Sequence, residues 1–479
     1  MFEDTPRPGL WKRLLLGAVV VILASAGATA VAAFREVDRV VSALKQQPEL
    51  KLGKQLAQTD PGDPQTLMIL GSDRRPQINT EGALPGARSD TIILMRLDPD
   101  KKAIALMSLP RDLQVRIPGH GTDKINAAYE QGGPKLTLQT VKRLTGLPIN
   151  HVINVDFRGF WAAVDAIGCV YADIDRRYYN NSAAYTYINV ESGYQKLCGR
   201  TALQYVRFRH EDNDLVRSAR QQDFLRQAKQ QVGASELIDD RERLVKIFGK
   251  YTESDAGLKS RAELLRLLKL AVFSVNNPIR EVHFEGRIGP SYVTASQRRV
   301  DKLVQQFLGV EETPGPRGQL APKGKKRRKG GGDPGLEKVP AEGKDQAVQA
   351  VQQGAGGRLP VFYPTVRTKR ALFAGPPRVY KIRANDGKLY GAYRMIIKRG
   401  SVGEYYGVQG TTWKDPPILR NPSETRRIGR RTFELQFAGD RVRLVSWRTK
   451  TAVYWVSNTL LQTLTERQML AIARSTKTL

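Results

Sequence analysis

The sequence predicts a layered α/β domain, preceded by an N-terminal transmembrane helix and followed by a small β-rich domain. Three observations support this prediction. Residues 14–33 carry no charge. Short apolar runs alternate with helix-like stretches over residues 65–310, as in sheets covered by helices. A Gly- and Lys/Arg-rich stretch at 311–358 then separates this region from the strand-like patterns of 359–479.

The uncharged run at residues 14–33 matches the thickness of a membrane. Twenty helical residues span about 30 Å, which is the width of a bilayer hydrocarbon core. Trp-Lys-Arg at 11–13 stands before it, as an interfacial anchor does. We therefore expect a cytoplasmic tail at 1–13, an anchor at 14–33 and a polar stalk at 34–64. A cleaved signal peptide is the competing interpretation, because Ala-Thr-Ala at 28–30 suits a cleavage site.

The formal net charge of +30 implies an anionic partner, such as nucleic acid, an anionic membrane or a phosphorylated substrate. No helix-turn-helix and no aromatic-interleaved RNA motif is present, so we expect no nucleic-acid partner. No P-loop or GxGxxG occurs, so we expect no nucleotide cofactor. The four histidines show no zinc-ligand spacing.

Cys169 and Cys198 are the only cysteines, and they lie in one predicted domain without metal-ligand spacing. A pair of cysteines beyond a membrane segment indicates a disulfide in an oxidising compartment. Two buried free thiols are the alternative. With the disulfide, the bulk of the chain lies outside the cytoplasm.

The apolar pattern predicts the individual elements of the first domain. We expect strands at 67–70, 91–97, 103–109 and 151–155, a further strand containing Tyr205-Val206-Arg207, and helices at 136–144, 158–167 and 214–231. Asp98 to Lys101 suits a hairpin turn, and Asn213 or Asp214 can cap the last helix.

The region at 359–479 predicts a sheet of its own, and residues 311–358 a disordered linker. We expect strands at 379–383, 390–398, 432–438 and 442–447, with a hairpin turn at 439–440. A final helix should follow Thr463, whose hydroxyl forms a capping box with Glu466. No catalytic constellation is visible in this region.

Two aspartates stand at ends of predicted strands. Asp73 follows one buried strand through a Gly turn, and Asp90 precedes the next. Ligand crevices of α/β sheets lie at such ends. Two carboxylates beside a diphosphate suit Mg²⁺, which completes its shell with water and phosphate. Simple turn capping by both residues is the alternative.

Arginines cluster beside the same turns and strand ends. Guanidinium binds phosphate oxygens through two parallel hydrogen bonds and stays charged at any working pH. Phosphoryl transfer requires mainly positioning and charge stabilisation, so an Arg-rich pocket is chemically sufficient. For any single arginine, a surface salt bridge is the ordinary alternative. The set is Arg88, Arg111, Arg207, Arg209, Arg217 and Arg220.

Residues 66–232 resemble the LytR-CpsA-Psr (LCP) family of bacterial cell-envelope phosphotransferases. The resemblance lies in LGSDRR at 70–75, RSDTIIL at 88–94, SLPRD at 108–112, KINAAYEQGG at 124–133, the pattern from VDAIGCV to LCGRTALQYVRFRH, and DNDLVRSARQQ at 212–222. It implies an α/β/α domain with a central mixed sheet. It also implies transfer of a glycopolymer from a polyprenyl diphosphate carrier to a peptidoglycan hydroxyl, with polyprenyl phosphate leaving.

The resemblance also assigns roles to individual residues. Asp73 and Asp90 match the Mg²⁺-associated aspartates. Asp112 follows the motif arginine, Arg111, and is expected to orient it. The diphosphate-binding positions match Arg88, Arg111, Arg207, Arg217 and Gln221; Arg209 and Arg220 match motif positions with less defined roles. An apolar pocket for the lipid is expected between the sheet and the helices.

Two features depart from the family pattern. Cys169 stands where glycine is common, and Cys198 precedes the Tyr-Val-Arg segment, so a disulfide between them would explain both. Residues 359–479 do not match the usual C-terminal extension. Three other activities are open: a lipid diphosphatase that uses water as acceptor, a non-enzymatic envelope regulator, and a protein that binds anionic wall polymer.

Overall fold

The computed structural model describes residues 35, 37–72, 89–101, 103–182, 187–208, 211–231, 241–274, 277, 279–309, 335–400, 404–439 and 441–479. The predicted tail and anchor, residues 1–33, lie outside the described residues, as do Asp73, Arg88 and Arg209. Of the helices that are described, none is both long enough and apolar enough to cross a membrane.

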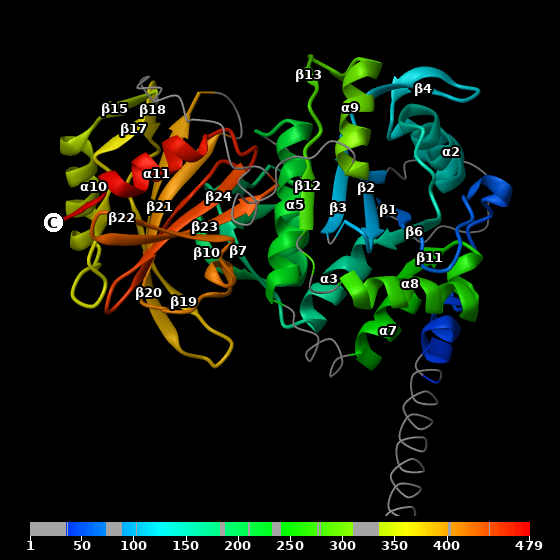
Figure 1. Ribbon diagram of the computed structural model, residues 1–479, viewed down its shortest axis with the longest axis horizontal. Coiled ribbons are helices and arrows are strands. Elements are labelled where there is room, and N and C mark those ends of the chain that lie inside the picture. Colours follow the sequence, from blue (N-terminus) through cyan, green and yellow to red (C-terminus); the bar gives the residue numbers. More distant parts are fainter. Residues whose placement is uncertain are drawn as a thin grey trace, which may run out of the picture.

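A six-stranded sheet forms the centre of the N-terminal domain (Figure 1), in the order β11-β6-β1-β2-β3-β12. β6 runs parallel to β1 and β12 runs parallel to β3, whereas the other neighbours are antiparallel. The predicted mixed central sheet is therefore confirmed. The strands are β1 Gln65–Ser72, β2 Ser89–Asp98, β3 Ala103–Leu109, β6 His151–Asp156, β11 Thr252–Ser254 and β12 Ile279–Val282.

Helices cover both faces of this sheet, because successive strand residues point to opposite sides. Met68 packs in the core beneath α2 (Ala127–Thr145) and α9 (Gln297–Leu308). Its neighbour Leu67 packs beneath α8 (Arg261–Ser274) on the other face. Three more helices surround the sheet: α3 Phe157–Ala166, α5 Asp214–Gln231 and α7 Arg241–Tyr251. α5 has the predicted bounds, and Asn213 caps it by accepting a hydrogen bond from the Val216 amide at 3.0 Å.

The expected strand at Tyr205-Val206-Arg207 is wrong, because these residues end a helix, α4 Gly199–Arg207. Ala202 and Val206 lie four residues apart and pack into the same core cluster. Helical spacing thus buries one face of this segment, which outweighs the β-propensity of its aromatic and β-branched residues.

Four two-stranded antiparallel pairs and two 3-10 turns complete the described part of the N-terminal domain. The ribbon formed by β7 and β10 matters most, because it lies between the central sheet's helices and the C-terminal domain (Figure 1). The pairs are β4 Gln114–Ile117 with β5 Gly121–Lys124, β7 Val170–Ile174 with β10 Gly193–Leu197, β8 Tyr178–Asn180 with β9 Ile188–Val190, and β13 Arg287–Ile288 with β14 Val293–Thr294; the turns are η1 Gly53–Gln55 and η2 Gly257–Lys259.

The C-terminal domain begins earlier than the sequence predicts. Residues 335–358 were expected to belong to a disordered linker, but they form β15 (Leu336–Lys338) and α10 (Pro340–Gln352). Pro340 occupies the first helical turn, where its missing N–H costs nothing. Ala347 and Ala350 are fully buried against the domain core. Small alanine side chains thus give α10 an apolar face, which the composition of this stretch does not indicate.

A large antiparallel sheet dominates this domain, in the order β18-β20-β21-β25-β24-β23-β22, with β19 also paired to β20. One face packs on α10 and on α11 (Glu466–Ser475), and the other face packs on the β7–β10 ribbon. The remaining elements are β16 Phe362–Tyr363, β17 Val366–Thr368, β18 Ala371–Phe373, β19 Arg378–Arg383, β20 Leu389–Arg399, β21 Tyr405–Thr411, η3 Pro417–Leu419, β22 Glu424–Ile428, β23 Arg431–Ala438, β24 Arg441–Arg448, β25 Val453–Ser457 and β26 Lys477–Thr478.

The predicted capping box of the last helix exists two residues later than expected. The helix starts after Thr465, and the box joins Thr465 to Gln468 instead of Thr463 to Glu466. Thr463 instead hydrogen-bonds Thr459 through its hydroxyl at 3.0 Å. Both threonines satisfy a capping pattern in the sequence, and only the chain's path decides between them.

Candidate functional site

The site forms at the end of the two central strands of the sheet, where β1 ends and β2 begins. Gly71 pairs with Thr91, but the next residue, Ser72, pairs with Ser89. Asp90 is therefore the extra residue of a β-bulge. Such bulges re-aim side chains next to active sites. Asp90 is described here only by its backbone, and Asp73 and Arg88 lie outside the described residues.

Gly71 allows the strand end to be packed closely. A Cβ on Gly71 would lie 3.1 Å from the Cβ of Thr91 and 3.6 Å from the ring of Phe157. Phe157 opens α3, and its ring carries the guanidinium of Arg207, whose Cζ lies 4.1 Å from the ring centroid. The phenyl ring thus supports Arg207, at the end of α4, next to the bulged end of β1 and β2.

Asp214 holds two of the predicted phosphate-binding arginines. Arg217, one turn later on α5, forms an ion pair with its carboxylate, and the Nε of Arg111 lies 4.0 Å from Oδ1. Burial raises the pKa of Asp214, with Asp112 adding to the rise, while Arg217 and Arg111 act against it. One buried carboxylate therefore sets the spacing between two guanidinium groups that come from distant segments.

Asp112 contacts Lys124 and Asp214. Its carboxylate pairs with Lys124 at 3.1 Å, while its backbone amide donates to Asp214 Oδ2 at 3.3 Å. Asp214, which the sequence suggested only as a helix cap, thus lies between Arg111, Arg217 and the backbone of Asp112. The orientation of Arg111 by Asp112 stays a prediction. The sequence did contain a signal for Asp214, because an aspartate three residues before an arginine can pair with it on a helix.

Gln221 joins the remaining parts of the site. Its Nε2 donates to Thr91 Oγ1 at 3.0 Å and to the carbonyl oxygen of Val206 at 3.3 Å. This side chain links α5 to the start of β2 and to the end of α4, next to Arg207. Gln221 thus links α5, the helix that carries Arg217, to the backbone of the residue before Arg207.

Arg220 points elsewhere, although it is one residue from Gln221. It is fully buried, pairs with Asp212, and donates from Nη1 to the carbonyl oxygens of Tyr205 at 3.2 Å and Phe208 at 2.9 Å. In the structure its guanidinium braces the chain around Arg207. Direct binding of substrate by Arg220, expected from the motif, has no support in this geometry.

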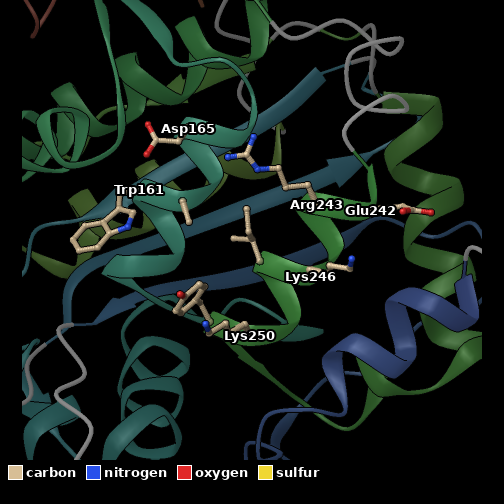
Figure 2. A pocket seen from close by; sticks show the side chains of 9 residues that line it. Trp161, Asp165, Glu242, Arg243, Lys246 and Lys250 are labelled. Carbon is tan, nitrogen blue, oxygen red and sulfur yellow. The ribbon is translucent and has the colours of Figure 1, made fainter.

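A pocket of about 660 Å³ opens between α3 and α7 (Figure 2). The aromatic rings of Trp161 and Tyr251 line it, and basic side chains from α7 stand around them; these are Arg243, Lys246 and Lys250. Trp161 lies one turn after Phe157 on α3, and two carboxylates, Asp165 and Glu242, also line the pocket. The pocket is therefore apolar along its aromatic rings and mixed in charge around them.

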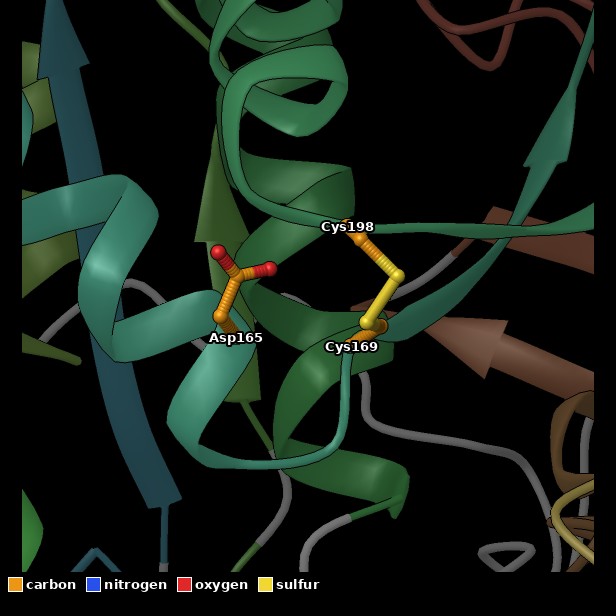
Figure 3. A group of neighbouring side chains, drawn as sticks. All are labelled: Asp165, Cys169 and Cys198. Atoms are coloured by element: carbon orange, nitrogen blue, oxygen red, sulfur yellow. A yellow bond between two sulfur atoms is a disulfide. The ribbon is translucent and has the colours of Figure 1, made fainter.

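Cys169 and Cys198 form a disulfide, which confirms the predicted pairing (Figure 3). They stand just beyond the paired residues Val170 and Leu197, so the bond closes the β7–β10 ribbon. In the described part of the chain, the only grouping of metal-ligand side chains joins these cysteines with Asp165. Both sulfurs are consumed by the disulfide, so this group is not a metal site.

Removal of the disulfide should destabilise the chain. Closing a loop of this length contributes about 3–4 kcal/mol, and urea unfolding of Cys169→Ser/Cys198→Ser should show this loss. Cys169 has a φ of +70°, a conformation in which glycine is unstrained. Cys169→Gly/Cys198→Ser should therefore retain about 1 kcal/mol more than the double serine variant. Equal stability of all three proteins would contradict a structural role for the bond.

A family model and several known proteins match this chain. The LytR_cpsA_psr family model matches residues 29–307. The polyisoprenyl-teichoic acid–peptidoglycan teichoic acid transferase TagU of Oceanobacillus iheyensis is 29% identical over 307 residues, covering 62% of this chain and 89% of the relative. TagT of Bacillus subtilis, a transferase of the same description, is 28% identical over 63% of this chain and 95% of the relative.

A solved structure described as TagT bound to LI-WTA covers 55% of this chain and all of its own length, with 25% identity and a TM-score of 0.42. The motif residues described above lie inside the span that the family model matches, which is more than half of the chain. The chain therefore belongs to the LytR_cpsA_psr family.

Proposed function

We propose that this protein transfers a glycopolymer from a polyprenyl diphosphate carrier to a hydroxyl group of peptidoglycan. The acceptor oxygen forms a phosphodiester with the phosphorus that bears the polymer. The bond from this phosphorus to the bridging oxygen breaks, and polyprenyl phosphate leaves. The relatives TagU and TagT are named for this kind of transfer, with teichoic acid as the polymer.

The proposal is supported above all by three contacts near the bulged end of β1 and β2: Arg111 and Arg217 approach the same carboxylate of Asp214, Gln221 of the same helix bonds Thr91 and the carbonyl oxygen of Val206, and Arg207 follows Val206. Guanidinium groups in fixed positions stabilise the charge that develops on phosphoryl oxygens, and they need no covalent nucleophile for this. Because Asp214 and Phe157 hold three of them before substrate arrives, little reorganisation is needed during the reaction.

The pocket between α3 and α7 supports the choice of a lipid-linked donor. It lies along α3, the helix whose first residue, Phe157, stacks on Arg207, and it combines aromatic rings with basic side chains and with the carboxylates of Asp165 and Glu242. A diphosphate at the arginines could thus extend its apolar chain along α3. We further propose that the domain works outside the cytoplasm, held by an anchor at residues 14–33; the disulfide supports this placement, since such bonds persist in oxidising compartments.

The direct test uses the purified full-length chain in detergent with a polyprenyl diphosphate-linked polymer and peptidoglycan fragments. We expect polymer joined to peptidoglycan and an equal amount of polyprenyl phosphate. Release of polyprenyl phosphate without attachment would instead indicate a diphosphatase. If neither product forms, the proposal fails. A reporter fused to the C-terminus tests the topology, because a cytoplasmic C-terminus would contradict the extracytoplasmic placement.

We also propose that Asp73 and Asp90 hold Mg²⁺. The other carboxylates of the site are already engaged, since Asp112 pairs with Lys124 and Asp214 pairs with Arg217. The bulge at Asp90 supports this assignment, because a bulge leaves its extra residue outside the strand pairing, at the start of β2. When bound, the ion would neutralise negative charge on the diphosphate.

Chelation should therefore lower transfer at least about tenfold, and added Mg²⁺ should restore it. Mg²⁺ should also raise the melting temperature of the wild-type chain but not of Asp90→Asn, because a ligand that binds only the folded state stabilises it. This second measurement does not depend on activity. Full transfer after chelation, or an equal Mg²⁺ effect in both proteins, would contradict the assignment.

A further inference from the structure

Helix α5 contacts both domains of the protein. On one side, Arg217 and Gln221 belong to the arginine site. On another side, Val216 and Ala219 are buried in a small cluster with Leu460, which follows β25 of the C-terminal domain. Figure 1 shows α5 standing between the central sheet and the C-terminal sheet. The helix that carries the site is therefore packed against a domain outside the matched family region.

The C-terminal sheet is docked on the β7–β10 ribbon through specific polar contacts. Arg394 of β20 pairs with Asp173 of β7 at 2.5 Å, and the indole N–H of Trp455 donates to the same carboxylate at 3.3 Å. Tyr380 accepts a hydrogen bond from the Tyr194 amide at 2.7 Å. Asp173 and Arg394 are almost completely buried, and they line a small cavity of about 30 Å³ between the two domains.

A buried ionic network leads from this docking surface to the arginine site. Arg176, just after β7, donates to Asp212 at 2.8 Å, and Asp212 also pairs with Arg220. Arg220 in turn holds the carbonyl oxygens of Tyr205 and Phe208, on either side of Arg207. The network thus braces the connection between α4 and α5, whose ends carry Arg207 and Arg217.

The outer side of this network is covered by the C-terminal domain. The guanidinium of Arg176 lies between aromatic rings, with its Cζ 4.6 Å from the ring centroid of Tyr178 and 5.4 Å from that of Tyr405. Tyr178 belongs to the N-terminal domain, whereas Tyr405 begins β21 of the C-terminal sheet. The side chain of Arg176 is only 9% exposed. An aromatic ring that covers a guanidinium restricts the motion of that group. The cation–π attraction between the two is stronger when the guanidinium is partly desolvated.

We propose that Tyr405 and Arg176 are positioning residues, through which the docked C-terminal domain holds Arg207 and Arg217 in the geometry that binds the diphosphate. The C-terminal domain is then part of the scaffold of the site and not a separately tethered module. The effect on diphosphate binding rests on the proposed function; the bracing of the α4–α5 connection does not.

The test compares full-length Tyr405→Ala, Tyr405→Phe and Phe373→Ala with the wild-type chain. Phe373 is a matched control. The Cζ of Arg367 lies 5.9 Å from the centroid of its ring, and both residues lie within the C-terminal domain. Amide hydrogen exchange of residues 199–208 and 211–221 reports the bracing directly. Calorimetry with farnesyl diphosphate reports the affinity of the site, and initial rates separate kcat from KM.

In Tyr405→Ala we expect exchange in these two segments to become about tenfold faster and diphosphate affinity to fall by about five- to tenfold. Tyr405→Phe keeps the ring and should stay near the wild-type values. Phe373→Ala should lower the melting temperature without changing either measurement. Wild-type exchange in Tyr405→Ala, or the same change in Phe373→Ala, would overturn the inference. Faster exchange in a chain that never binds diphosphate would uphold the bracing and reject the proposed function.

Discussion

Replacing Arg207 with alanine will lower the rate of polymer transfer by about a thousandfold and leave the fold intact. The guanidinium stacks on Phe157 near the bulged end of β1 and β2, where no other described side chain of α4 can take its place. The lost stacking should cost only about 1 kcal/mol of stability, since Arg207 is partly exposed. Transfer rates with saturating and limiting donor, together with urea unfolding, check both expectations.

Arg177→Ala is the matched control for this experiment. Arg177 also stacks on an aromatic ring, with its Cζ 4.8 Å from the centroid of Tyr179, but it pairs with Glu191 away from the bulged end of β1 and β2. Its loss should leave transfer unchanged. Arg207→Lys should recover only part of the rate, because an ammonium group cannot bind two phosphate oxygens in parallel. An Arg207→Ala protein with wild-type activity would remove the chemical basis of the proposed function.

Arg220→Met should instead act mainly on stability. The substitution leaves Asp212 buried with one of its two cationic partners removed, and breaking such a pair costs about 3–5 kcal/mol. The free energy of unfolding of the N-terminal domain, measured in urea, will show this loss. Any fall in transfer should then follow from disorder around Arg207 and not from a lost phosphate contact.

A second substitution separates these two explanations. Adding Asp212→Asn to Arg220→Met removes the uncompensated carboxylate charge and should recover at least about 1 kcal/mol. Arg176 would then retain its ion pair with Glu211. If Arg220→Met abolished transfer with no loss of stability, Arg220 would be a direct ligand, as its place in the family motif suggests.

Several features of this protein can be predicted from short stretches of sequence. Strand 103–109 and helix 214–231 have the expected bounds, because their apolar spacing and flanking turn or cap residues agree with one another. The two cysteines can pair only with each other. Where local signals conflict, prediction fails: the aromatic and β-branched residues at 205–208 favour a strand, yet packing of Ala202 and Val206 on one face forms α4.

Residue identity in the motifs therefore settles which chemical groups this chain can offer: guanidiniums, carboxylates and amides beside turns and strand ends. The folded arrangement decides how each group is used. Arg217 and Arg220 are three residues apart on one helix, yet Arg217 meets Asp214 in the site while Arg220 is buried with Asp212. Both carboxylates are close in sequence, but the further partners are not: Arg111 approaches Asp214 from a distant segment, and the end of α4 supplies the carbonyl oxygens that bind Arg220. The placement of these segments is a property of packing rather than of local order.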